Sequence, residues 1–350
     1  MRIVDVEHLC GGEIIAKDIT YTNGTVLLKK YTKYRAGFKD KLVELNIPFV
    51  YVEDELSEGI EPEVLISNER KAVLAKEFGE EVDKIKTNMT VEVKHIKQIV
   101  DSLIEEISGK NIMYDIMDIK RNDADVYEHS IGVAIITLLL CKKLNLNIDL
   151  TKDIVIGALL HDIGKILIPK EVLEKKEKLN EKEQELIWEH PKMGYNIIKD
   201  NASISAVTKV VVLCHHERED GSGYPLGKGS ELHIGAKIVA CCDVFNALTS
   251  SRAYRQGMEL NEVVVLLRTE RLNLEVRTAL ESILAFYPVG TCVLLSNGAV
   301  GIVEKNYQGN LKRPLVRIVK DGSTFLDSTY RMDLSQEPRV FIAQRLGNIS

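Results

Sequence analysis

Histidine and aspartate side chains gather in the middle of the chain, in an order that suits metal chemistry. Five of the eight histidines fall between positions 129 and 216, each at the end or the beginning of an apolar stretch. Two aspartates join them, one directly after His161 and one in the segment VACCDVFNALTS. The full set is His129, His161, Asp162, His190, His215, His216 and Asp243.

These residue types indicate which cations they would hold. Imidazole nitrogen and carboxylate oxygen together suit Fe, Mn, Zn or Ni, whereas an all-oxygen set suits Mg or Ca. A carboxylate can bridge two cations, so Asp162, beside His161, is the natural bridging ligand. Two cations roughly 3.5–4 Å apart can hold a phosphate and generate a hydroxide between them. A single histidine is more often an ordinary core or surface residue, but seven residues in this order favour a metal centre for phosphate chemistry.

The elements that must position these residues are helices. Residues 112 to about 285 consist of segments with helical periodicity separated by polar turns, and successive sites lie about one helix hairpin apart. A helical bundle brings ligands from different helices to one point in its core. We therefore predict a mainly α protein in which residues 112–285 form the catalytic bundle.

The two ends of the chain have a different pattern. Short β-like pieces, such as Pro48 to Val52, occupy the first 55 or so residues and precede an acidic, solvated loop. Near the other end, the dipeptide Asn297-Gly298 between two apolar runs predicts a hairpin. We predict a small α+β regulatory or dimerisation region at 1–66, a connecting helix at 67–111, and a small β subdomain at 286–350.

The connecting helix carries an apolar seam with two interpretations. Apolar residues recur in steps of four and three, and Gly109 then ends the pattern. The seam predicts either a two-stranded stalk in a homodimer, formed through the 89–107 helix, or an amphipathic helix that lies on its own domain. Fewer than three full heptads do not choose between them. The seam residues are Met89, Val93, Ile96, Val100, Leu103 and Ile107.

Composition excludes several classes of partner. A formal charge of −6 argues against a binder of nucleic-acid polymers or of membrane surfaces. The longest apolar run, Ile131 to Cys141, is about half of what a bilayer requires, so no membrane insertion is expected. The first ten residues have acids where a signal peptide would be apolar, which favours the cytoplasm. The six cysteines form no C-x-x-C pair and are expected to be reduced thiols, mostly small core residues.

The motifs resemble a known family. His161-Asp162, with His129 upstream and Asp243 downstream, is similar to the HD phosphohydrolase superfamily. The chain also resembles the HD-GYP subgroup, through His190 and several sequence runs between about Asn122 and Gly257. These runs are HDIGK, IPKEVL, HHE, DGSGYP and ALTSSRAYR.

This resemblance implies an activity and a set of ligands. Members of the family hydrolyse the second messenger cyclic di-GMP, and some cleave cyclic GMP-AMP. The first metal is implied to bind His129, His161, Asp162 and Asp243, and the second to bind Asp162, His190, His215 and His216. Two or three divalent ions are expected, with Fe or Mn favoured. In the family subset with three metals, the extra ligand is a carboxylate at the position of Asp125, one helical turn before His129.

The resemblance also implies how the substrate is held. Lys165 would contact the scissile phosphate and act with Asp162 in catalysis, while Tyr224, Arg252 and Arg255 would lie near the nucleotide. Three positions depart from the family pattern, and none is an expected metal ligand. They are Asn246, where the family has Asp, Leu167, where it has Gly, and His233, where proline is common.

We therefore expect a phosphodiesterase that attacks cyclic di-GMP with a metal-bridging hydroxide and yields linear pGpG, GMP or both. One alternative is a hydrolase of cyclic GMP-AMP or of another nucleotide. His190 and the His215-His216 pair disfavour the simpler mononuclear members, which lack them. The other alternative is a non-catalytic receptor for the cyclic dinucleotide. Loss of metal ligands marks such a receptor, and none of them is lost here.

Overall fold

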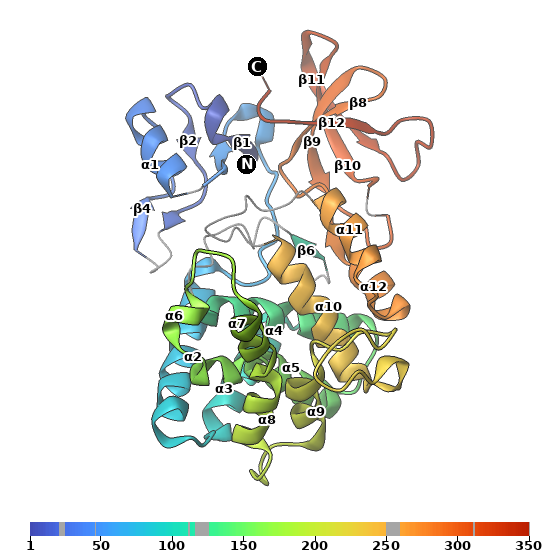
Figure 1. The fold of residues 1–350 in the computed structure, drawn as a ribbon. Helices are drawn as coiled ribbons and strands as arrows, with labels where there is room; N and C mark the ends of the chain where they lie inside the picture. The colour runs from blue at the N-terminus through green and yellow to red at the C-terminus, as the bar shows by residue number, and fades with distance from the viewer. Residues whose placement is uncertain are drawn as a thin grey trace.

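The computed structural model is mainly helical, with a small sheet region at each end of the chain, which confirms the predicted fold class. It describes residues 1–20, 25–45, 47–110, 113–115, 126–249, 260–310 and 312–349. Figure 1 shows the helical part on one side of the molecule and the two sheet-containing parts together on the other.

Helices of the central part form a bundle around one large apolar core. The middle helices, α4, α5, α9 and α10, contact one another, and α4 is apolar nearly all round because neighbours surround it. A two-residue parallel pair, β6 (Tyr114–Asp115) with β7 (Leu284–Ala285), joins the two ends of this part. The helices are α2 (Asn68–Asn88), α3 (Val93–Ile107), α4 (Val126–Lys143), α5 (Ile148–Leu160), α6 (Lys170–Leu173), α7 (Glu181–Trp188), α8 (His190–Ile198), α9 (Ala206–Cys214), α10 (Ile234–Thr249), α11 (Leu260–Thr269) and α12 (Leu274–Glu281).

The predicted connecting helix is two helices, and its seam is used inside the chain. Met89 adopts a left-handed conformation (φ 54°) that ends α2, and it is exposed. From Val93 to Ile107 the seam residues of α3 are at most 7% exposed and belong to the core of the bundle, where α3 packs on α2 and α5. The amphipathic-helix interpretation is therefore correct. The dimer stalk through the 89–107 helix is not, because its apolar face is already covered.

A small sheet of order β1-β5-β2 forms the N-terminal part, with a two-stranded β3-β4 sheet beside it. Val50 and Val52 alternate into its core from β5, as the predicted strand at Pro48 to Val52 requires. Its elements are β1 (Arg2–Asp5), β2 (Ile14–Ile15), β3 (Ile19–Thr20), β4 (Val26–Leu28), α1 (Lys39–Glu44) and β5 (Phe49–Glu53).

The C-terminal part is an antiparallel sheet of order β11-β10-β9-β8-β12. The predicted hairpin joins β8 to β9, and Gly298 takes the positive φ (89°) of its turn. Strand β11 is the longest, and sequence reasoning missed it because most of its side chains are exposed and show no apolar alternation. The strands are β8 (Cys292–Leu295), β9 (Ala299–Lys305), β10 (Leu315–Asp321), β11 (Thr324–Asp333) and β12 (Ile342–Leu346).

The two end regions pack against each other, which the sequence did not predict (Figure 1). The Ile3 amide donates to the Gly290 carbonyl (2.8 Å), and the Arg2 guanidinium reaches the Asn348 side chain (2.5 Å). A shared apolar cluster includes Ile60 from the first region and Ile302 from the last. The N-terminal and C-terminal parts therefore lie together on one side of the bundle.

Cysteine exposure agrees with the expected structural role. All six thiols are free, and five of them are buried, with Cys10 exposed. Burial raises the pKa of the Cys141 and Cys241 thiols to about 12, which keeps them protonated and unreactive. Within the described residues, no helix is both long enough and apolar enough to cross a membrane.

Truncation of the buried seam tests its intrachain role. Leu103→Ala should lower the free energy of unfolding by about 2–5 kcal/mol, because it leaves a cavity in the core. The exposed neighbour Glu105 provides a control, whose alanine variant should change stability by less than about 0.5 kcal/mol. Urea unfolding followed by circular dichroism measures both. A midpoint of unfolding that rises with protein concentration in the wild type but not in Leu103→Ala would instead indicate that the seam joins two chains.

Candidate metal centre

Helix ends deliver most of the seven candidate ligands to one place in the bundle. His161 follows the last residue of α5, His190 begins α8, and His215 follows the last residue of α9. Asp243 is the exception, since it lies inside α10. All of these side chains except His216 are buried.

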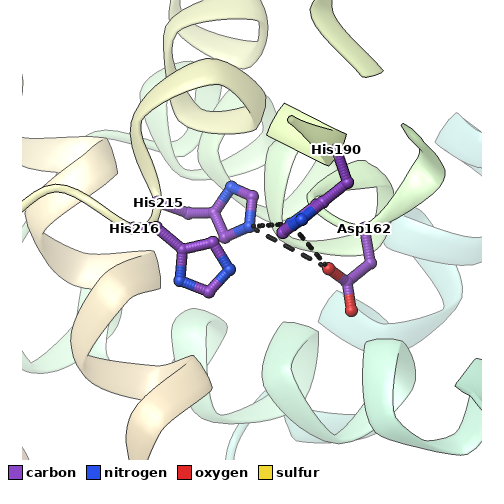
Figure 2. Close-up of side chains that lie close together, drawn as sticks. All are labelled: Asp162, His190, His215 and His216. Atoms are coloured by element: carbon purple, nitrogen blue, oxygen red, sulfur yellow. Dashed lines mark hydrogen bonds and ion pairs between the residues drawn. The ribbon is translucent and has the colours of Figure 1, made fainter. Parts of the chain in front are cut away.

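Four of the ligands form the first group, which we call the Asp162 cluster: Asp162, His190, His215 and His216. Figure 2 shows the Asp162 carboxylate pointing toward the His190 and His215 rings, with His216 alongside. Asp162 Oδ1 lies 3.2 Å from His190 Nε2 and 4.0 Å from His215 Nε2. Ligand atoms of the four residues all lie within 4.8 Å of one another.

The remaining three ligands form the second group, which we call the His129 cluster: His129, His161 and Asp243. Asp243 Oδ1 lies 3.1 Å from His129 Nε2 and 3.8 Å from His161 Nε2. The other oxygen of Asp162, Oδ2, lies 3.4 Å from His161 Nε2. One carboxylate thus faces both clusters, with one oxygen toward each.

Backbone carbonyls fix the tautomers of three histidines. The Nδ1 atoms of His161, His190 and His215 lie 2.7–2.9 Å from the carbonyl oxygen three residues earlier. A carbonyl can only accept, so each Nδ1 carries the proton and each Nε2 of a neutral ring presents a lone pair. His190 Nε2 and His215 Nε2 are 3.1 Å apart, so two lone pairs face each other.

The clusters fit bound cations. Within the described part of the chain, His161 Nε2 and Asp162 Oδ1 are buried and have no hydrogen-bond partner. Buried polar atoms are normally paired, and facing lone pairs repel, so both features call for a positive charge between the ligands. Neutral imidazoles with carboxylates are the donors that Fe, Mn and Zn take.

His129 obtains its orientation from a side chain instead. Its Nδ1 lies 2.7 Å from Asn246 Oδ1, so the amide oxygen accepts a hydrogen bond from Nδ1–H and Nε2 faces Asp243. Gly132 makes this contact fit, because a Cβ at that position would lie 2.6 Å from the Asn246 amide nitrogen. Asn246, noted from sequence only as a departure from the family, thus orients the His129 ring through the nitrogen that faces away from Asp243.

The electrostatics keep the carboxylates ionised. Burial favours the neutral form of Asp162, but neighbouring positive charge, foremost that of the Lys165 ammonium, outweighs it and lowers the pKa of that carboxyl well below its usual value. Burial likewise opposes ionisation of Asp243, while its contact with His129 lowers its pKa. Burial lowers the pKa of His216 to about 3, and its ring is therefore neutral at physiological pH. Burial lowers the pKa of His161, but Asp162 outweighs burial and raises it. Because ionised carboxylates and neutral imidazoles are the forms that bind metal, a cation at His161 would take the place of its Nε2 proton.

Lys165 lies at the edge of the Asp162 cluster. Its ammonium donates to Asp162 Oδ2 at 2.5 Å, and its side chain is 29% exposed. Close packing places this segment, because a Cβ at Gly164 would lie 2.0 Å from the His190 carbonyl oxygen. The turn after Asp162 therefore rests directly on the start of α8, which brings the carboxylate to His190.

The loop after His216 covers the Asp162 cluster. The Tyr224 ring stacks on the His216 ring, with centroids 4.7 Å apart and planes 22° apart. Glu217, fully buried, holds this loop by accepting hydrogen bonds from the amides of Leu226, Gly227 and Lys228. The sequence run included Glu217 but gave no signal of its role as a backbone clamp.

The remaining predicted residues lie outside the described residues or away from the two clusters. Asp125, Arg252 and Arg255 fall outside the described residues. His233 donates no ligand to either cluster and instead accepts from the Gly235 amide at the start of α10.

Comparisons with known proteins agree with this geometry. Residues 111–275 match the family model described as an HD domain, and residues 292–348 match one described as a KOW domain associated with HD domain. The C-terminal sheet is thus a recognised companion of the bundle.

Individual relatives match over parts of their length. The chain is 30% identical over 267 residues to the cyclic di-GMP phosphodiesterase PA4108 of Pseudomonas aeruginosa, covering 75% of this chain and 64% of the relative. It is 38% identical over 174 residues to the 3′3′-cGAMP-specific phosphodiesterase 1 of Vibrio cholerae, covering 48% and 38%. A solved HDG"Y"P protein, Bd1817 from Bdellovibrio bacteriovorus, aligns over 80% of this chain and 98% of its own, with a TM-score of 0.49 and 15% identity.

The chain thus spans less than two thirds of both curated relatives. The HD-domain match covers the segment that carries both clusters, and the relatives hydrolyse cyclic dinucleotides according to their names. Residues 111–275 of the chain are therefore an HD domain, and the HDIGK and HHE-to-GYP runs of its sequence are those of the HD-GYP family.

Proposed function

We propose that the chain is a metal-dependent phosphodiesterase that hydrolyses cyclic di-GMP to linear pGpG, to GMP, or to both. The observation that carries the proposal is the pair of buried imidazole and carboxylate clusters that meet at Asp162. Names of relatives, including the cyclic di-GMP phosphodiesterase of P. aeruginosa, support the choice of substrate.

Each cluster would hold one divalent cation. His129, His161, Asp162 and Asp243 would hold one, and Asp162, His190, His215 and His216 the other. Fe or Mn is the proposed metal, and Asp125 remains the proposed ligand for a third. Bound cations would supply the Lewis-acid charge for hydrolysis of the phosphodiester.

The chain's own residues contribute binding and charge. Asp162 would keep the two cations together, since it presents one oxygen to each cluster. Cations bound at the two clusters would neutralise the Asp162 carboxylate. The Lys165 ammonium, which donates to Asp162 Oδ2 in this structure, would then contact the phosphate instead. Tyr224, Arg252 and Arg255 are proposed to lie along the nucleotide.

Cyclic GMP-AMP is the second candidate substrate. The Vibrio cholerae relative, 38% identical over 174 residues, is named as specific for it. A non-catalytic receptor is less well supported, because all seven ligand positions retain a side chain that can bind metal.

Direct product analysis tests the proposal. Protein purified without oxygen and loaded with Fe or Mn is incubated with each dinucleotide, and the products are separated by chromatography. We expect metal-dependent conversion of cyclic di-GMP to pGpG or GMP, abolished by a chelator. Intact cyclic dinucleotides after incubation with fully metal-loaded protein would contradict the proposal.

Replacement of the shared carboxylate should remove both metal and activity. Asp162→Ala is expected to abolish hydrolysis and to strip most bound metal, because both clusters lose an oxygen. The protein should still fold, since the helices keep their apolar faces. Metal analysis and turnover are compared with those of Asp200→Ala, which replaces an exposed acid just after α8. Near-normal turnover with metal retained in Asp162→Ala would exclude the shared-carboxylate assignment.

Replacement of Lys165 distinguishes a role in binding the phosphate from a role in supporting the metal ligands. Lys165→Ala should keep full metal content but lose activity on the order of 10²-fold, the usual cost of one charge-assisted contact in the transition state. Lys170→Ala, which removes an exposed ammonium five residues later, should match the wild type. Depleted metal in Lys165→Ala would mean that the ion pair with Asp162 supports the ligands, and the phosphate role would be withdrawn.

A further inference from the structure

A half-exposed tryptophan stands beside the proposed metal centre. Trp188 is the only tryptophan in the sequence, ends α7, and precedes His190 by two residues. The residue is 47% exposed, although tryptophan is usually highly buried. Its position therefore exposes a large aromatic surface near the place where chemistry is proposed.

Three rings connect this surface to the Asp162 cluster. The Trp188 ring lies 5.6 Å from the Tyr224 ring (33° between planes), and Tyr224 stacks on His216. The His216 ring in turn lies 4.2 Å from the His215 ring. The two rings nearest the surface are held in place, since Glu217 holds the Tyr224 loop and Trp188 belongs to α7.

The column has the geometry of a stacking platform. Nucleobases stack on aromatic side chains, and indole offers the largest face of any of them. A phosphodiester held at the Asp162 cluster carries its bases on either side, within reach of a neighbouring aromatic surface. The exposed part of Trp188, nearly half of the residue, is available for a flat ligand.

We propose that Trp188 binds a purine base of the cyclic dinucleotide by stacking while the phosphodiester lies at the metal centre. This inference rests on the proposed function and deepens it. Stacking makes use of the π face that every base has, so Trp188 contributes affinity without distinguishing guanine from adenine. Its loss should therefore affect cyclic di-GMP and cyclic GMP-AMP alike.

Two substitutions separate stacking from mere bulk. Trp188→Leu keeps an apolar side chain without an aromatic face, and Trp188→Phe restores a smaller face. The KM of each dinucleotide that the wild type cleaves should rise about tenfold in the leucine variant, equivalent to about 1.4 kcal/mol, with kcat nearly unchanged. The phenylalanine variant should recover most of this loss. The inhibition constant of inorganic phosphate, which has no base, and the metal content should stay at wild-type values in both.

Trp188 also serves as its own probe. Stopped-flow mixing of the metal-loaded wild type with cyclic di-GMP should change the tryptophan emission before turnover, whereas inorganic phosphate should leave it unchanged. An unchanged KM in Trp188→Leu would overturn the stacking role alone. A lower kcat with a shifted phosphate inhibition constant would mean that Trp188 only supports the Tyr224 loop. A wild type that neither binds nor cleaves any cyclic dinucleotide would overturn both the proposed function and the platform.

Discussion

The site depends on hydrogen bonds from imidazole Nδ1 atoms to backbone carbonyls near helix ends. His161, His190 and His215 each donate to the carbonyl three residues earlier, and His129 donates to Asn246. Each bond fixes a ring and its tautomer, so that Nε2 lone pairs converge where Asp162 and Asp243 bring negative charge. A buried convergence of acceptors is unfavourable by itself, and a cation is the group that relieves it.

Close packing in the bundle holds these side chains in the positions that this arrangement requires. Gly164 lets the turn after Asp162 rest on the backbone of α8, and Gly132 lets Asn246 reach across from α10 to α4. A side chain at Gly164 would force the turn away from α8, and one at Gly132 would displace the Asn246 amide that contacts His129. Outside this inner part, Glu217 clamps a loop by its backbone, so that Tyr224 covers His216. The same contacts extend from the ligands to the rim at Trp188.

Sequence reasoning could single out the seven candidate ligands because few other roles require histidine and aspartate at apolar helix ends. It predicted the mainly α fold, and its strands at both ends of the chain recur in the structure. The carbonyl partners of the histidines left no trace in the sequence, since any residue supplies a carbonyl. Asn246 and Glu217 were noted in the sequence, but their roles could not be predicted because they arise from contacts between different segments. The seam of α3 was ambiguous because the same periodicity serves a dimer stalk or a buried helix.

Crystallography of the manganese-loaded protein, with anomalous scattering to locate the metal, tests the central claim most directly. The account predicts one anomalous peak among the ligands of the His129 cluster and another among those of the Asp162 cluster, with the Asp162 carboxylate in contact with both. His161, His190 and His215 should keep their Nδ1 contacts to the backbone. Fully loaded crystals without a peak at either cluster, or with Asp162 turned away from the metal, would contradict it.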